Sequence, residues 1–360
     1  MAPVVTALER DPRFAVHVIA TAQHRDLLDQ VLGHFGIRAD ADLDVMTEGQ
    51  SLTDVASRAL VRLEPVLQKM RPDFVLVHGD TSTTLMGALA AFYQRIPSGH
   101  VEAGLRSHNM WDPFPEEANR KLVAQLVEAH FAPTRVSKEN LLREGIRPEA
   151  IFVTGNTAID ALYLTTRRRE ERPGEEMILV ECHRRENLGR AHRESFLGLR
   201  DVLEARPGAH LVFSVHPNPG VAEVAHETLG DHPRARLIAP PPYPEWVRLM
   251  ERATVLVTDS GGAQEEAPAL GLPVVLLRRT TERPEAIEAG TVIRADPNRA
   301  AVRDMVMRLL TDSALYDEMV LATNPYGDGR AADRIVGGLA FSLRMDASRP
   351  ADFERAWKTT

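Results

Sequence analysis

The stretch TVLVTDSGGAQEEAPALGLPVV, residues 254–275, decides the fold of this chain. The β-branched and apolar residues 254–257 predict a strand, a glycine turn follows at 260–262, and residues 263–270 predict a helix. Glycines let backbone N–H groups come close to a ligand, and a helix start adds the positive end of a dipole. Strand, turn and helix together can therefore hold a phosphate group. An ordinary glycine turn before an acidic helix start explains the same segment equally well.

Length, composition and charge bound the class of protein. At 360 residues and 44% hydrophobic content, the chain can bury a large core and predicts two domains. A net charge of −8 without a basic stripe argues against nucleic acid as a partner. The single cysteine, Cys182, excludes an internal disulfide and indicates a reducing compartment. No long apolar run and no signal-peptide pattern is present, so we expect a soluble cytoplasmic protein that does not bind a membrane.

Short β-rich runs alternate with longer helical patterns along the chain. The expected strands are 16–20, 74–78, 98–101, 130–132, 151–153, 177–180, 210–214, 236–238, 254–258, 273–277 and 290–293. The expected helices are 52–70, 82–95, 115–128, 137–144, 191–205, 243–252 and 300–311. This alternation predicts an α/β fold with parallel sheets and crossover connections. We expect two Rossmann-like domains facing across a cleft, with ligands at the carboxyl ends of the strands.

The charged stretch RRREERPGEE, residues 167–176, predicts the connection between the domains. The first domain is then 1–166 and the second 167–339. A helix near 340–360 is expected to return to the first domain.

Three acidic residues follow candidate strands or open a helix. Asp80, in VHGDTSTT, suits either catalysis or the N-cap of the helix that begins near Ser82. Glu102 follows the short strand in HVEAGLRS, and an acid so close to an apolar strand end needs a partner or a function. Glu116, in PFPEEANR, lies at a helix start after Pro115, where the helix dipole alone also favours a glutamate.

Two histidines follow strands in the second half of the chain. His183, in ECHRRENLGR, precedes Arg184 and Arg185, which suit either a diphosphate or a solvated basic loop. His216, in SVHPNPG, repeats the pattern, although a structural histidine explains that position alone better. Neither has metal-ligand spacing, so we expect no metal site. Three carboxylates and a histidine after separate strands, with a phosphate turn, predict a nucleotide-sugar enzyme that acts by general acid–base catalysis.

Together these motifs resemble the non-hydrolysing UDP-N-acetylglucosamine 2-epimerases of bacteria. The matching segments, in family order, are TAQHRDLLDQVL (21–32), VLVHGDTSTTL (75–85), GHVEAGLRS (99–107), PFPEEANR (113–120), TGNTAIDAL (154–162), HRREN (183–187), VHPNP (215–219), TDSGGAQEEAP (258–268), TTERPEA (280–286) and NPYGDGRA (324–331). The resemblance implies a GT-B-like fold, a homodimer and an isomerase without NAD or a required metal, feeding surface-polysaccharide synthesis. It implies elimination of UDP to a 2-acetamidoglucal and re-addition with the opposite C2 configuration, so that UDP must be held throughout.

The resemblance also carries roles onto individual residues. It implies that Asp80, Glu102 and Glu116 are the catalytic acids and His183 the active-site histidine near the diphosphate. For UDP binding it implies the turn residues Ser260, Gly261 and Gly262, the ribose contact Glu266, and Arg283. For a second, activating UDP-N-acetylglucosamine pocket it implies Gln23, Arg184, Glu186 and His216.

The start of the chain departs from the family pattern. Members open with a strand and a loop of the form FGTRPEAIKMAP, of which Met1, Ala2 and Pro3 match only the end. We therefore expect a misplaced start, with an arginine, a lysine and a central strand absent. A GT-B glycosyltransferase, a hydrolysing epimerase that releases free ManNAc, and a nucleotide-sugar-binding protein without catalysis stay open as alternatives.

Overall fold

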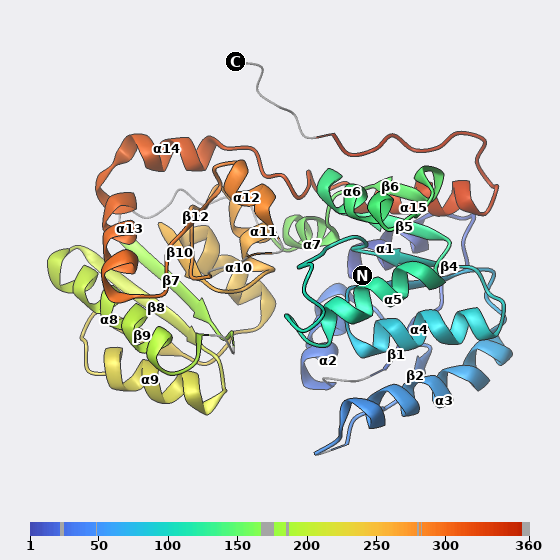
Figure 1. The fold of residues 1–360 in the computed structure, drawn as a ribbon, viewed down its shortest axis with the longest axis horizontal. Coiled ribbons are helices and arrows are strands. Elements are labelled where there is room, and N and C mark those ends of the chain that lie inside the picture. Colours follow the sequence, from blue (N-terminus) through green and yellow to red (C-terminus); the bar gives the residue numbers. More distant parts are fainter. Residues whose placement is uncertain are drawn as a thin grey trace. The chain divides into compact units, whose positions relative to one another are not determined.

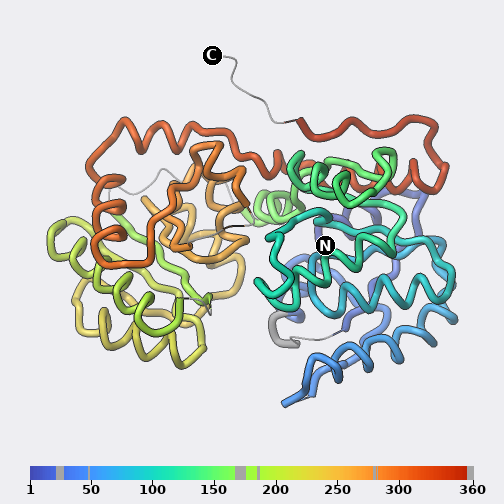
Figure 2. Tube along the Cα trace, viewed as in Figure 1, coloured from blue at the N-terminus to red at the C-terminus, as the bar shows by residue number. Residues whose placement is uncertain are grey.

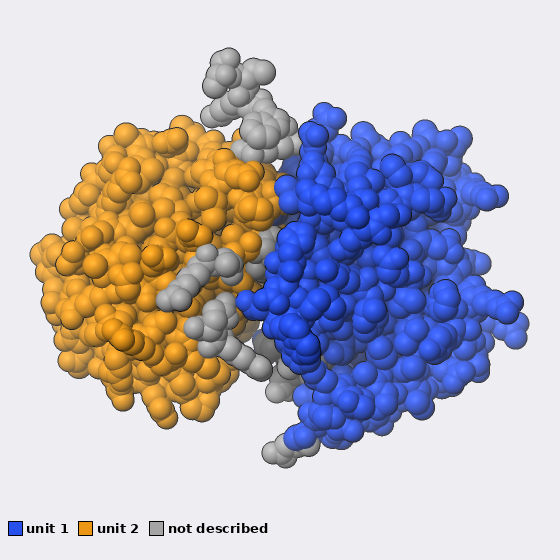
Figure 3. All heavy atoms as spheres, in the orientation of Figure 1, with its two compact units in different colours: residues 1–161, 326–354 blue, residues 162–325, 355–360 orange. Residues whose placement is uncertain are grey.

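The computed structural model describes residues 1–21, 25–47, 49–166, 176–184, 187–278, 281 and 283–354. They form two compact units, coloured separately in Figure 3. Unit 1 combines Met1–Ala161 with Tyr326–Glu354, and unit 2 is Leu162–Pro325. The predicted connection at 167–176 lies outside the described residues, apart from Glu176 at the start of a strand.

Unit 1 contains two parallel sheets (Figure 1). The larger has the order β3 (Val75–His78), β4 (Ser98–Val101), β5 (Ala129–Ala132) and β6 (Ile151–Val153). The smaller pairs β1 (Ile19–Ala20) with β2 (Ala41–Asp42). β1 is shorter than the expected strand 16–20, because the Val18 N–H is taken by the Asp40 side chain at 2.8 Å.

The helices of unit 1 begin and end where local chemistry allows. Their bounds are α1 (Ala2–Arg10), α2 (Arg25–Phe35), α3 (Leu52–Met70), α4 (Ser82–Tyr93), α5 (Glu116–Leu126), α6 (Arg135–Arg143), the 3₁₀ turn η1 (Pro148–Ala150), α7 (Thr157–Thr165), which runs on into unit 2, and α15 (Ala331–Ser342). A capping box between Ser51 and Asp54 opens α3, and Arg71 in the left-handed conformation closes it.

The chain returns to unit 1 earlier than expected. Among the described residues, the last helix, α15, ends at Ser342, and residues 346–354 are not helical; the end of the range expected for a helix near 340–360 lies outside the described residues. α15 packs beside α1, and Val4, Leu8 and Ile335 share a core with Phe131 and Phe152 of the sheet. Figure 2 shows this red segment beside the blue start of the chain. The helix therefore lies where its apolar face covers the sheet.

The described residues of unit 2 form one six-stranded parallel sheet with helices around it. Its order is β12 (Val292–Arg294), β11 (Val274–Leu276), β10 (Val255–Thr258), β7 (Glu176–Cys182), β8 (Ala209–Val215) and β9 (Ala235–Ile238). Its other helices are α8 (Arg190–Ala205), α9 (Pro219–Leu229), α10 (Tyr243–Arg252), α11 (Ala263–Ala269), α12 (Pro284–Glu288), α13 (Arg299–Thr311) and α14 (Ser313–Leu321).

The strand order of unit 2 places its candidate site. From β7 the chain proceeds to β8 and β9 on one side, and from β10 to β11 and β12 on the other. Ligands of such sheets bind at the switch point, here outside the carboxyl ends of β7 and β10. The predicted α/β class with parallel sheets is confirmed in both units. No helix in the described part of the chain is long and apolar enough to cross a membrane.

Candidate functional site

The carboxylate of Asp80 is held by an arginine rather than used as a helix cap. Thr81, not Asp80, caps α4, since the Thr81 side chain accepts from the Thr84 N–H. Asp80 Oδ2 accepts from Arg120 Nη2 at 2.7 Å and from Nε at 3.1 Å. Asn119 Nδ2 also donates to the Asp80 carbonyl at 2.8 Å. The N-cap interpretation of Asp80 is therefore wrong, and the start of α5 is tied to the end of β3.

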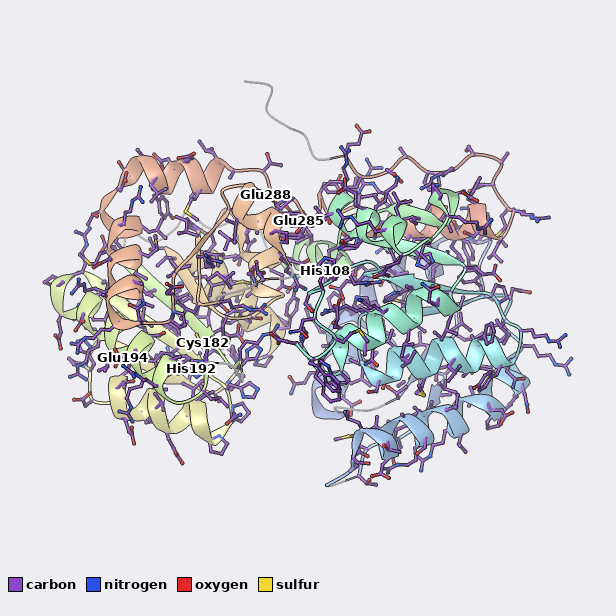
Figure 4. The ribbon with its side chains drawn as sticks, in the orientation of Figure 1. His108, Cys182, His192, Glu194, Glu285 and Glu288 are labelled. Carbon is purple, nitrogen blue, oxygen red and sulfur yellow. The ribbon has the colours of Figure 1, made fainter. Side chains whose placement is uncertain are left out.

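The same arginine serves a second, fully buried carboxylate. Glu117 Oε2 accepts from Arg120 Nη1 at 3.1 Å and from the Ser107 N–H at 2.9 Å, and Glu117 Oε1 accepts from the His108 N–H at 3.1 Å. Figure 4 labels His108 on the loop that these bonds hold. Both Glu117 and Arg120 are buried. Sequence reasoning missed this pair, although its three-residue spacing on a predicted helix is typical of ion pairs.

Glu102 occupies a strained position directly after β4. Its φ of 68° lies in the left-handed region, which non-glycine residues rarely adopt. Oε1 of Glu102 accepts from Asn156 Nδ2 at 3.0 Å, and Oε2 lies 3.7 Å from His78 Nε2. Burial lowers the pKa of His78 well below its ordinary value. Strain of this kind persists where the surrounding structure holds it, and it is typical of functional sites.

Glu116 is the first residue of α5, with Pro115 at the N-cap. The helix thus begins one residue later than Pro115 suggested. Glu116 is half-buried, whereas Glu117 beside it is buried. The structure therefore brings Asp80 and the residues around Glu116 together through Arg120.

In unit 2 the ring and backbone of His183 are both fixed. Its Nδ1–H donates to Glu181 Oε1 at 2.6 Å, and its backbone N–H donates to Asp259 Oδ1 at 2.8 Å. The ring stacks on His216 with centroids 5.5 Å apart. The hydrogen bond to Glu181 raises the pKa of His183 against the opposing effect of burial. Glu181 escaped sequence reasoning, although it lies only two residues before the predicted histidine.

Asp259, directly after β10, organises the loop that follows β7. Its carboxylate accepts from the Arg184 N–H at 3.2 Å, Asn187 Nδ2 at 3.0 Å and His192 Nε2 at 3.2 Å, besides the His183 N–H. Figure 4 labels His192, one of these donors, in unit 2. Burial opposes ionisation of Asp259, but hydrogen bonds from His192 and Asn187 outweigh it and lower its pKa.

The last glycine of the turn, Gly262, has open space beside its backbone. Gly262 has ordinary helical dihedral angles, φ −65° and ψ −41°, so its conformation does not demand glycine. A Cβ atom at Gly262 would meet nothing within 4 Å. Ser260 donates its N–H to Thr258 Oγ1 at 2.9 Å. Neither strain nor packing accounts for this glycine, which suits close approach of a ligand.

The two remaining predicted UDP contacts have partners in unit 2. Glu266 Oε1 accepts from the Tyr243 hydroxyl at 2.7 Å, and burial raises the pKa of Glu266 to about 7. Arg283 Nε donates to Glu265 Oε1 at 2.5 Å, and both of these side chains are buried. Tyr243 was not among the predicted site residues.

The predicted activating pocket is described in part. Gln23 and Glu186 lie outside the described residues. Arg184 is the next residue after His183 in the sequence, and the ring of His216 stacks on the ring of His183. Burial and the neighbouring His183 lower the pKa of His216. Among the described residues, no group of three or more acidic, histidine or cysteine side chains is arranged to hold a metal ion.

Comparisons with known proteins match nearly the whole chain. A family model described as UDP-N-acetylglucosamine 2-epimerase matches residues 6–340. The chain is 47% identical to the UDP-N-acetylglucosamine 2-epimerase of Bacillus subtilis, over 98% of this chain and 94% of that protein. The S. aureus MnaA–UDP co-structure matches with a TM-score of 0.92 at 44% identity, covering 98% and 96% of the two chains. A Neisseria meningitidis UDP-GlcNAc 2-epimerase bound to UDP-GlcNAc matches with a TM-score of 0.89 at 41% identity, covering 96% of each chain.

These matches bear on two predictions from the sequence. They do not support the expectation that an N-terminal strand and loop are absent through a misplaced start. They do cover the segments that carried the family resemblance, from the acids at Asp80 and Glu102 to the turn at Ser260. The chain belongs to the UDP-N-acetylglucosamine 2-epimerase family.

Proposed function

We propose that this chain interconverts UDP-N-acetylglucosamine and UDP-N-acetylmannosamine without hydrolysis. The observation that carries the proposal is its 47% identity, over 98% of its length, to a UDP-N-acetylglucosamine 2-epimerase. In the proposed reaction a base removes the C2 proton, the C1–O bond to UDP breaks, and a C1=C2 double bond forms in a 2-acetamidoglucal. Re-addition of UDP to C1 with protonation of C2 on the opposite face completes the inversion.

We assign the proton transfers to the carboxylates of unit 1. Removal and return of a proton on opposite faces of C2 require acid–base groups on both sides of the sugar. Asp80, Glu102 and Glu116 are the candidates. Arg120 holds Asp80 through two hydrogen bonds, and Asn156 holds Glu102 through one. Such fixed carboxylates lose little orientational freedom when a substrate binds, which favours proton transfer.

We assign the leaving UDP to unit 2. The negative charge that develops on the diphosphate needs donors and positive charge placed in advance. His183 supplies an imidazolium, and the turn of Ser260, Gly261 and Gly262 supplies the backbone N–H groups of its two glycines, since the Ser260 N–H is bound to Thr258. Glu266 would accept from the ribose hydroxyls, and Arg283 is a further UDP-binding candidate. Because UDP must return to the sugar, these contacts hold an intermediate as well as a substrate.

We also propose a homodimer and a second UDP-N-acetylglucosamine pocket that activates turnover. Arg184 and His216 are its described members, with Gln23 and Glu186 from the same sequence motifs. His216 stacks on His183, so an activator that contacts His216 has a direct physical route to the proposed catalytic histidine.

Epimerisation in D₂O tests the proposal. Reversible elimination should place deuterium at C2 of both UDP-sugars, in enzyme treated with EDTA and without added NAD. Free ManNAc with UDP would favour a hydrolysing epimerase instead, and a need for an acceptor would favour a glycosyltransferase. Tight UDP-sugar binding with no turnover and no exchange would leave only a binding protein.

A further inference from the structure

A carboxylate that no predicted role uses lies beneath His183. Glu181 is the penultimate residue of β7, and its Oε1 accepts from His183 Nδ1–H at 2.6 Å. Its other oxygen, Oε2, accepts from the Thr258 hydroxyl at 3.0 Å. Thr258 is the residue opposite Glu181 in the neighbouring strand β10. Both oxygens of this half-buried carboxylate therefore have fixed partners.

We propose that Glu181 is a positioning residue for His183, fixing which ring nitrogen is free and placing a negative charge beside the ring. This inference rests on the proposed function, in which His183 balances charge on departing UDP. With Nδ1 bound to Glu181, only Nε2 can donate to a ligand. A paired carboxylate plays the same part wherever a histidine must present one nitrogen in one orientation.

Three contacts leave the ring little freedom. Asp259 fixes the His183 backbone N–H, Glu181 fixes Nδ1, and His216 covers one face of the ring. The ring is therefore already oriented when the protein folds, so that Nε2 does not have to be ordered when an anion binds or forms.

A hydrogen-bonded chain links this histidine to the glycine turn. Ser260 N–H donates to Thr258 Oγ1, and the Thr258 hydroxyl donates to Glu181 Oε2. Glu181 in turn accepts from His183. Thr258 thus uses its one proton and one lone pair to connect two groups proposed to hold the same diphosphate. A change at Glu181 should reach the turn as well as the ring.

The charges around His183 agree with a protonated ring. The hydrogen bond to Glu181 raises the pKa of His183, with Asp259 acting in the same direction and burial and Arg184 acting against it. His216, whose Nδ1 accepts from the Asn218 N–H at 3.1 Å, has a pKa that burial and the neighbouring His183 lower. Since a raised pKa keeps a proton to higher pH, the imidazolium is lost only as pH rises past the ordinary range of histidine.

The substitution Glu181→Gln separates charge from hydrogen bonding. Glutamine keeps an acceptor for Nδ1–H but removes the negative charge, so the pKa of His183 should fall while Nδ1 stays protonated. The alkaline limb of the kcat–pH profile should move to lower pH, with kcat down about tenfold near pH 8.5 and little changed near pH 6. Glu176→Gln at the start of the same strand, which breaks a half-buried ion pair with Arg206, is the matched control.

The readouts are ¹⁵N NMR of the histidine rings in the full chain, with His183 assigned through His183→Asn, and kcat against pH. An unchanged pKa and unchanged alkaline limb in Glu181→Gln would overturn the inference. If Glu181→Ala fails to fold, the glutamine variant still decides the question. Full turnover by His183→Asn would instead refute the proposed role of His183, so the two failures are distinguishable.

Discussion

The two units hold their charged site groups in different ways. In unit 1 the buried guanidinium of Arg120 binds both Asp80 and Glu117, so a single side chain supports two carboxylates. In unit 2 Asp259 accepts from four separate N–H groups, two of the backbone and two of side chains. Asp80 and Glu117 of unit 1 therefore share one ion-paired residue, whereas Asp259 of unit 2 is supported by several hydrogen bonds. Substitutions at these supporting residues test the difference between the units.

Glu102→Gln tests whether unit 1 supplies proton transfer without holding UDP. Only the acid–base function is removed, because glutamine still accepts from Asn156. We expect kcat to fall about 10³-fold, while the Kd for UDP stays within about threefold of wild type. Turnover by product analysis and UDP binding by calorimetry measure the two quantities. Glu128→Gln, at an exposed position of unit 1, is the control. A large loss of UDP affinity would contradict the division of labour.

Arg120→Met tests the dependence on one side chain. It leaves Glu117 charged and fully buried without its cation, which should destabilise unit 1 by about 3–5 kcal/mol. Loss of the bonds to Asp80 should lower kcat by about 100-fold. Thermal unfolding and kcat give both values. Adding Glu117→Gln should recover part of the stability but not the activity. Recovery of activity in the double variant would show that Arg120 acts only through stability.

Features that depend on residues close together in the sequence could be predicted, whereas contacts between distant residues could not. Parallel strands, the helices 52–70 and 243–252, and the acids at strand ends follow from periodicity within a short window. The Asp80–Arg120 bond joins residues 40 positions apart, and its existence depends on how α5 packs against α4 and β4. The N-cap interpretation of Asp80, one of the two that the sequence left open, is wrong for the same reason: Thr81 caps the helix, and the distant Arg120 binds the carboxylate of Asp80.

The position of α15 shows another limit. The apolar face of α15 packs against α1 and the sheet of unit 1, whose residues lie more than 100 positions away in sequence. Glu181 is a different case. The alternation of a strand predicts which face it lies on, but its bond to His183 requires the chain to turn sharply after β7.

Asp259→Asn is the counterpart of Arg120→Met in unit 2. Asparagine keeps one acceptor but loses the charge and the second oxygen, so some of the four donors lose their partner. Because four donors contribute to this support, we expect the free energy of unfolding to fall by about 2 kcal/mol and UDP to bind about tenfold more weakly. Both effects should be smaller than those of Arg120→Met. Calorimetry and thermal unfolding measure both, with the exposed Asp231→Asn as control. A loss of stability as large as that of Arg120→Met would remove the contrast between the units.

Glu266→Gln tests a carboxylate whose ionisation is opposed by burial. Burial raises its pKa from 4.5 to about 7. The folded chain thus binds this proton more tightly than the unfolded chain, so stability is highest below the unfolded pKa and falls as pH rises toward 7. Glutamine should abolish that decline, leaving the variant about 1–2 kcal/mol more stable at pH 8. Its UDP affinity should nevertheless drop several-fold as the ribose contact weakens.

Thermal unfolding from pH 5 to 8 and UDP calorimetry follow these two effects. Glu245→Gln, exposed on α10 near Tyr243, should keep the pH dependence of wild type. If the stability of wild type and of Glu266→Gln changed equally with pH, ionisation of Glu266 would have little effect on stability. The expected loss of stability in exchange for UDP binding would then be contradicted.

His216→Ala should have the smallest effect on turnover itself and a specific effect on activation. The substitution removes the ring that stacks on His183 but leaves its bonds to Glu181 and Asp259. Unit 2 distributes its support, so His183 should keep its position, and kcat at saturating substrate should fall by no more than about threefold. The rate curve against UDP-N-acetylglucosamine should lose its sigmoidal form if His216 contacts an activator. His226→Ala, exposed on α9, should keep the wild-type curve, and unchanged cooperativity in His216→Ala would remove this residue from the activating pocket.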